Sequence, residues 1–143
     1  MRGPVALVGS GEYLPVLEQV EAALIAGRPP RFVQLATAAA PEGQASLARW
    51  HDLGLDSARR LGVEQVVLPV VDRVSADDDA LASLVEGAGL VYLSGGNPPF
   101  LVSHALLASP SCRAVKRRRI IAARGGPRQG SSVAAGRATH PRY

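Results

Sequence analysis

The sequence predicts an α/β domain in which a mostly parallel sheet lies between two layers of helices, a three-layer sandwich. Two observations lead to this fold class. Short apolar runs alternate with longer amphipathic segments over the first 110 residues. Turns rich in glycine or small residues follow three of the four runs, as expected where a parallel strand passes into its crossover connection. The 143 residues are 47% hydrophobic, which suffices for one domain with a real core.

Four apolar runs have the length and composition of buried strands. Each is short and ends near a turn or a capping residue, which favours a strand over a buried helix. The predicted strands are Pro4–Val8 (PVALV), Arg31–Ala36 (RFVQLA), Val63–Val70 (VEQVVLPV) and Leu90–Leu93 (LVYL).

Four intervening segments are predicted as helices because their apolar residues recur on one helical face. Gly27 and Gly62 follow the first two of them and are typical of helix ends. The third opens with Ser-Ala-Asp-Asp, which is good capping chemistry, so Asp77–Asp79 are interpreted as a helix start and not as a metal site. The predicted helices are Pro15–Ala26, Gln44–Leu61, Ser75–Glu86 and Pro99–Leu107.

The chain divides by charge. Residues 1–111 hold seven arginines and all 12 acidic residues, whereas residues 112–143 hold nine basic residues and no acid, so the net charge of +4 comes from the tail. We therefore expect a domain body over 1–110 and a basic, divergent tail over 111–143 that is partly disordered. Ser111–Ala123 could form a helix, but Pro, Gly and Arg then stand where a fifth buried strand should be.

Composition also limits where the protein works. No segment reaches the ~20 apolar residues that span a bilayer, and the first apolar run is too short for a signal peptide. The single cysteine, Cys112, has no partner for an internal disulfide. We expect a soluble cytoplasmic protein that needs no cofactor and no metal and makes no membrane contact.

Glycine-rich turns follow the first and fourth predicted strands. In Gly9-Ser10-Gly11-Glu12 the third glycine of a dinucleotide fingerprint would fall at Leu14, so nucleotide binding is disfavoured. Gly11 and Glu12 are either a structural turn or a loop on the substrate side. In Ser94-Gly95-Gly96-Asn97-Pro98 the glycines can expose backbone N–H groups that would stabilise an oxyanion, although a plain strand-to-helix turn explains them equally well.

A third cluster, Gly130-Ser131-Ser132-Val133, has small residues around a serine. This composition is typical of a nucleophile elbow, in which small neighbours allow a strained turn that presents the hydroxyl. A flexible Gly/Ser tail has the same composition.

Taken in order, LVGSGEYLPVLEQV, LATAAAPEG, WHDLG…RLGVE, LPVVDR and GLVYLSGGNPPFL resemble the dipeptidase E and cyanophycinase family of serine peptidases. The resemblance covers residues 4–110 and implies a class I glutamine amidotransferase-like fold, which this chain would leave incomplete at its C-terminus. It also implies a serine nucleophile that forms an acyl-enzyme while cleaving peptide bonds of a small peptide or amino-acid-derived substrate. The resemblance further implies that Gly95, Gly96 and Asn97 form the oxyanion loop and that Ser132 is the nucleophile.

The tail departs from that pattern. Pro127-Arg128-Gln129 replaces the apolar strand before the serine, and Val133-Ala134-Ala135 replaces the Ala-Gly-Ala after it. The family's catalytic histidine lies well downstream, whereas this chain offers only His140 there. A serine without a base is a weak nucleophile, so we expect weak or no activity from the chain as written.

Two other functions stay open. The body could be a non-catalytic module that binds a small ligand, or the cations of the tail could bind a polyanion. No aromatic residue interleaves Lys116–Arg119 and no nucleic-acid motif accompanies them, so nucleic acid is not the expected partner.

Overall fold

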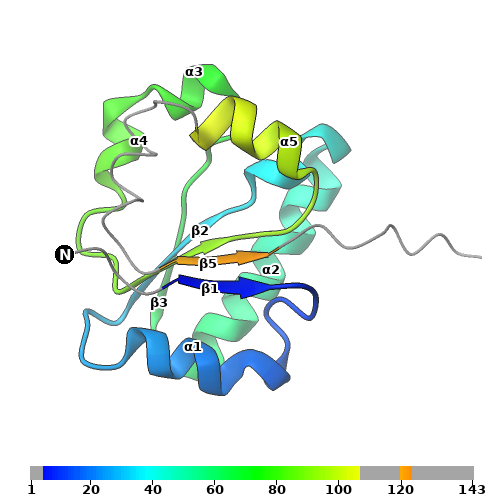
Figure 1. Cartoon of the computed structure of the whole chain (residues 1–143). Helices are drawn as coiled ribbons and strands as arrows, with labels where there is room; N and C mark the ends of the chain where they lie inside the picture. Colours follow the sequence, from blue (N-terminus) through cyan, green and yellow to red (C-terminus); the bar gives the residue numbers. More distant parts are fainter. Residues whose placement is uncertain (1–4, 107–119, 124–143) are drawn as a thin grey trace, which may run out of the picture.

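The computed structural model describes residues 5–106 and 120–123, and the surroundings of side chains as far as residue 104. Within this part of the chain, five parallel strands form one sheet in the order β1-β5-β4-β2-β3 (Figure 1). Their bounds are β1 Val5–Val8, β2 Arg31–Leu35, β3 Glu64–Val67, β4 Leu90–Leu93 and β5 Ile120–Ala123.

Strand β5 corrects the prediction for the tail. It lies between β1 and β4, with Ile120 opposite Val5 on one side and Val91 on the other. The helix predicted to span Ser111–Ala123 is therefore wrong for its last four residues, and residues 111–119 lie outside the described part. Adjacent isoleucines favour a strand over a helix. The fifth strand exists, but it precedes the Pro-Arg-Gln segment in which the sequence pattern placed it.

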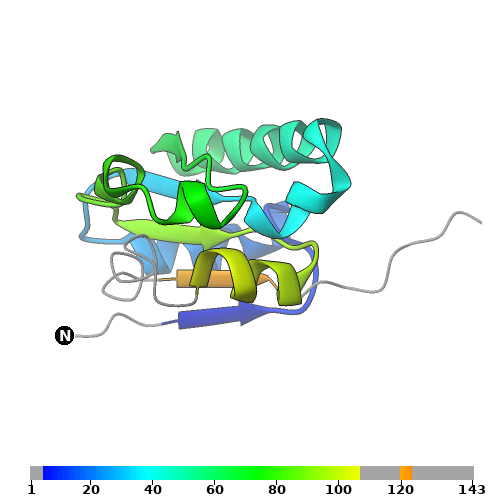
Figure 2. The same ribbon diagram turned by 90° about the horizontal axis from the view of Figure 1, so that it is seen from above.

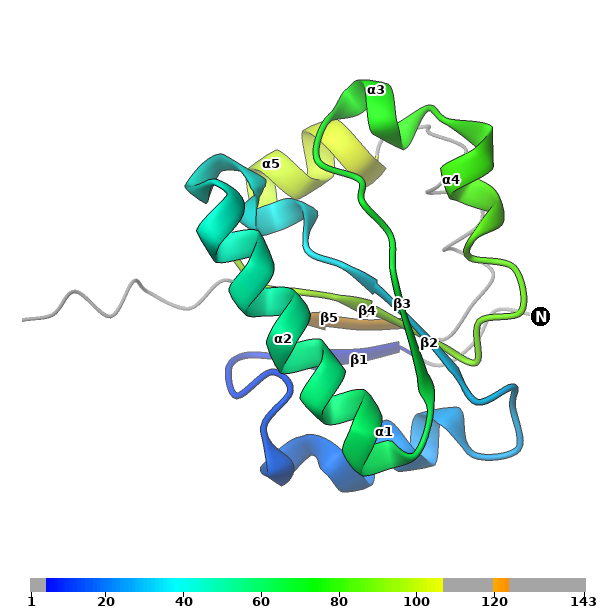
Figure 3. The same ribbon diagram turned by 180° about the vertical axis from the view of Figure 1, so that it is seen from behind.

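The helices form two layers, one on each face of the sheet (Figures 1 and 3). Helices α1 (Glu18–Ile25) and α2 (Gln44–Leu61) cover one face, and the short helices α3 (Arg73–Ala76), α4 (Asp79–Ser83) and α5 (Pro98–Leu101) cover the other. The remaining turns are the 3-10 helices η1 (Pro15–Leu17) and η2 (Thr37–Glu42) and the π-helical turn η3 (Val102–Leu106).

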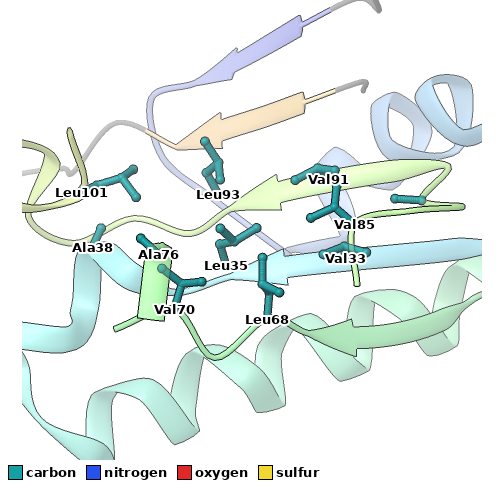
Figure 4. Packing of buried hydrophobic residues seen from close by; sticks show 11 residues of the cluster. Val33, Leu35, Ala38, Leu68, Val70, Ala76, Val85, Val91, Leu93 and Leu101 are labelled. Carbon is teal, nitrogen blue, oxygen red and sulfur yellow. The ribbon is translucent and has the colours of Figure 1, made fainter. Parts of the chain in front are cut away.

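Alternating residues of the central strands build a core on each face. Val33, Leu35, Val91 and Leu93 point into the core shared with α3, α4 and α5 (Figure 4). The residues next to them turn to the opposite face, where Phe32, Leu90 and Tyr92 pack with residues of α1 and α2. Figure 2 looks onto the face of the sheet that carries α5, which lies in front of the strands. The predicted α/β three-layer sandwich with a parallel sheet is thus confirmed.

Local capping explains where the helices differ from prediction. The segment Ser75–Glu86 is two short helices, because Asp72 caps α3 and Asp78 caps α4 by accepting hydrogen bonds from backbone N–H groups. The loop after β2 winds into η2, and β3 ends at Val67, three residues before the predicted end. By contrast, α2 spans Gln44–Leu61 as predicted and ends at Gly62, which adopts the left-handed conformation.

Candidate functional site

The turns that follow β1, β2 and β4 meet at the carboxyl edge of the sheet, where ligands bind in open α/β folds. The Ser94 N–H donates to the Leu35 carbonyl at 2.9 Å, and the Asn97 N–H donates to the Ala38 carbonyl at 2.7 Å. These bonds place the Ser94–Asn97 turn directly beside η2. In Figure 1 the strands point toward this edge, and the chain passes from β4 over it into α5.

Gly96 is required at its position for two reasons. Its φ is +140°, and a Cβ built on it would lie 2.5 Å from the Ala38 carbonyl carbon. Any side chain would therefore push the turn away from η2. Gly96 is consequently the residue that allows the loops after β2 and β4 to touch.

Glu12 lies at the same edge, against the neighbouring glycine. A Cβ built on Gly95 would lie 2.6 Å from Glu12 Oε1 and 3.6 Å from Trp50 Cη2. Glu12 and Gly11 are half-buried, Gly95 is buried and Asn97 is exposed. The turns singled out after the first and fourth strands therefore meet at this edge.

A buried polar network lies beneath these two turns. Tyr13 follows Glu12 and has a φ of +62°, which is uncommon for a residue with a side chain. Its hydroxyl lies 2.5 Å from Ser94 Oγ, the residue before Gly95, and accepts a hydrogen bond from Gln34 Nε2 at 2.9 Å. The Tyr13 N–H donates to the Tyr92 hydroxyl at 3.2 Å. The Tyr13 backbone is thus bonded to Tyr92 on β4, and the Tyr13 side chain is bonded to Ser94 in the other turn.

Packing and electrostatics keep Tyr13 a neutral hydrogen-bonding group. The side chain is 1% exposed and its ring stacks on Tyr92 with 4.1 Å between ring centroids. Burial raises the pKa of Tyr13 well above its usual value, and the hydrogen bond with Ser94 offsets this only in part. The phenol therefore stays protonated and serves as a structural tie, not as an acid or base.

Sequence reasoning did not find this network. Gln34 Nε2 also donates to the Trp50 carbonyl at 2.7 Å, and Gln34 Oε1 accepts from Gln65 Nε2 at 2.8 Å. Gly54 makes room for Gln34, because a Cβ there would lie 2.4 Å from Gln34 Oε1. A glutamine inside an apolar strand, such as Gln34 in RFVQLA, was the available signal, since buried amides need several partners.

The oxyanion role of Gly95 and Gly96 stays a prediction, and it depends on their backbone N–H groups being free to donate. No acceptor for either N–H occurs among the residues that the structure describes. Asn97 acts differently, because its N–H is held by Ala38 and its side-chain Oδ1 caps α5 by accepting from the Phe100 N–H at 3.1 Å. Two adjacent donors in a tight turn can stabilise a developing negative charge.

The histidines within the described ranges do not join this cluster in any recorded contact. His104 Nδ1 lies 2.7 Å from Ser103 Oγ, but Ser103 Oγ also donates to the Pro99 and Phe100 carbonyls one turn earlier. This is side-chain bonding within one helix and not a nucleophile with its base. His51 projects from α2 toward β3. Ser132 and His140 lie outside the described residues, so their predicted roles stay predictions.

Residues 5–106 and 120–123 contain no group of three or more His, Cys, Asp or Glu side chains that could hold a metal ion. None of the helices in those ranges is long and apolar enough to cross a membrane.

The fold of this chain is similar to that of a solved peptidase. The structure is similar to the crystal structure of a peptidase from an acI-B1 Actinobacterium, with a TM-score of 0.80 and 37% sequence identity over 86% of this chain. The chain spans 54% of the length of that peptidase. No family model matches the sequence, and no curated protein matches it.

Proposed function

We propose that this protein is a serine-type peptidase of the dipeptidase E and cyanophycinase type, with weak or no activity. The observation that carries the proposal is the meeting of the Gly11–Glu12 turn with the Gly95–Gly96 turn at the carboxyl edge of the sheet, in a fold shared with a solved peptidase. A likeness of 37% identity supports more than a common fold, and a peptidase is what the resemblance of the sequence implies.

The proposed reaction is acyl transfer. Ser132 Oγ attacks the carbonyl carbon of a peptide bond, and the N–H groups of Gly95 and Gly96 hold the resulting oxyanion. Glu12, which lies against Gly95, contacts the substrate beside the cleavage site. The serine proton passes to water as the new bond forms. The tetrahedral intermediate then expels the amine, which takes a proton from water, and leaves an acyl-enzyme that water hydrolyses. The substrate is a small peptide or an amino-acid derivative.

We expect weak activity because the described residues place no histidine where it could accept the serine proton. A serine hydroxyl transfers its proton slowly unless a histidine or a similar group accepts it, and the residues near Glu12 and Gly95 supply no histidine contact in the described structure. Loss of triad members typically lowers kcat by about 10⁴–10⁶-fold. The glycine amides still contribute, because an oxyanion site retains part of the catalysis without the triad.

A fluorophosphonate probe tests the proposal. We expect slow covalent labelling of the purified chain, located at Ser132 by peptide mass spectrometry and lost in the Ser132→Ala variant. Ser131→Ala is the matched control and should label at the native rate. Absence of labelling at Ser132 after long incubation at high probe concentration would refute the serine-type assignment and favour the small-ligand module.

A further inference from the structure

A cavity of about 270 Å³ opens between α2 and the segment that follows β3. Its walls are mostly apolar side chains, among them Leu47 on α2 and Leu68 and Val70 after β3. These three side chains are 6%, 1% and 1% exposed, so they form a closed floor beneath a pocket that is partly open to solvent. It lies at the carboxyl ends of β2 and β3, on the side of the sheet away from β1.

The cavity is separate from the proposed peptidase site. Leu47 packs with Ala36 and Ala39, and this small cluster forms the wall between the two. Trp50 lies near Gly95, whereas the next residue, His51, lines the cavity. Consecutive residues on α2 therefore serve different sites, as expected from the turn of about 100° between them.

Two polar side chains of α2, Gln44 and His51, reach the cavity. They are seven residues apart and therefore share one helical face. None of the lining side chains carries a permanent charge. Burial lowers the pKa of His51, more than the nearby Asp52 carboxylate raises it, so the imidazole is neutral near pH 7. An apolar pocket with a few convergent polar groups is the usual form of a small-molecule site.

We propose that this cavity binds a small neutral molecule consisting of one apolar ring with a single hydrogen-bonding group, and that His51 pairs with that group. Size supports this class: an apolar cavity of ~150 Å³ accommodates benzene, so this volume accommodates about ten non-hydrogen atoms. Phenols and indoles have this size and polarity. Charged groups are disfavoured, because the apolar wall would desolvate them without supplying a counter-ion.

Binding of 4-methylphenol and indole, followed by ¹H–¹⁵N correlation spectra, tests the proposal. We expect saturable shifts confined to α2 and residues 68–71, with dissociation constants on the order of 0.1–1 mM for ligands of this size. Val71→Trp places an indole in the cavity and should abolish binding. Val74→Trp is the matched control, because Val74 is 82% exposed and does not line the cavity, and it should bind normally.

A second pair of variants tests the polar contact and does not depend on filling the cavity. His51→Phe keeps an aromatic ring and should weaken 4-methylphenol binding about tenfold while leaving toluene binding unchanged. His104→Phe, on another element, should change neither. Absence of binding to the native chain at millimolar probe, or equal binding by the Val71→Trp and Val74→Trp proteins, would overturn the proposal. Ser132 labelling is measured separately, so this failure leaves the peptidase assignment untouched.

Discussion

The hydrogen bond between Tyr13 and Ser94 should be an energetic tie between the two turns of the proposed site. Tyr13→Phe removes one hydroxyl and leaves Ser94 Oγ and Gln34 Nε2 each without one buried partner. A lost partner of this kind costs about 1–3 kcal/mol. We expect Tyr13→Phe to lower the free energy of unfolding by about 2 kcal/mol and Ser94→Ala by about 1–2 kcal/mol.

Urea unfolding of both single variants and the double variant measures the tie itself. At an m-value of about 1.5 kcal/mol/M, a loss of 2 kcal/mol moves the midpoint by about 1.3 M. Because both substitutions remove the same bond, the double variant should lose about 1 kcal/mol less than the sum of the single losses. Ser83→Ala is the control: the Ser83 hydroxyl donates to the Ala80 carbonyl on the exposed face of α4, and its loss should cost under about 0.5 kcal/mol. Additive losses for Tyr13 and Ser94 would show that their hydroxyls do not tie the turns together.

Two further predictions concern a buried acid and a constrained glycine. Burial raises the pKa of the Glu21 carboxyl, so the folded protein favours its protonated form. The stability that this protonation contributes is complete below about pH 4.5 and is lost as the pH rises through the raised pKa. Glu21→Gln should therefore gain stability relative to the native chain between pH 4 and 8 in urea unfolding; a constant difference would contradict this. Gly96→Ala should lose at least about 1–3 kcal/mol in thermal or urea unfolding, because its φ and the Ala38 backbone both exclude a Cβ. Gly9→Ala, with nothing within 4 Å, should be nearly neutral, and equal losses for the two glycines would contradict the role of Gly96.

The parts of the fold that local chemistry determines could be predicted from the sequence. Helix α2 has its predicted bounds because its amphipathic pattern ends at a glycine that can adopt the left-handed conformation. Within the segment Ser75–Glu86, the Asp78 side chain caps a second helix. The spacing of the apolar residues alone could not show that the segment contains this second helix start. Strand β5 was missed because the charges of Arg113–Arg119 dominate the pattern on one side and Arg124 follows on the other.

The proposed site was predictable in outline and not in detail. Parallel strands bring their following turns to one edge, so topology places the turns of Glu12 and Gly95 on the same edge of the sheet, although β5 lies between their strands. The tie through Tyr13 does not, because its partners are 21 and 81 residues away and no local pattern links them. Nor could the cavity beside His51 be predicted, since a cavity depends on how side chains from separate elements fill space.

A nuclear Overhauser spectrum of the purified chain shows most directly whether the turns after β1 and β4 share one edge of the sheet. Trp50 is the single tryptophan, so its ring protons can be assigned without ambiguity. We expect cross-peaks from the α protons of Gly95 to the Trp50 ring and to the side-chain protons of Glu12. Cross-peaks from Gly95 to its sequence neighbours alone, with Glu12 contacting neither Gly95 nor Trp50, would contradict a shared edge and with it the proposed site.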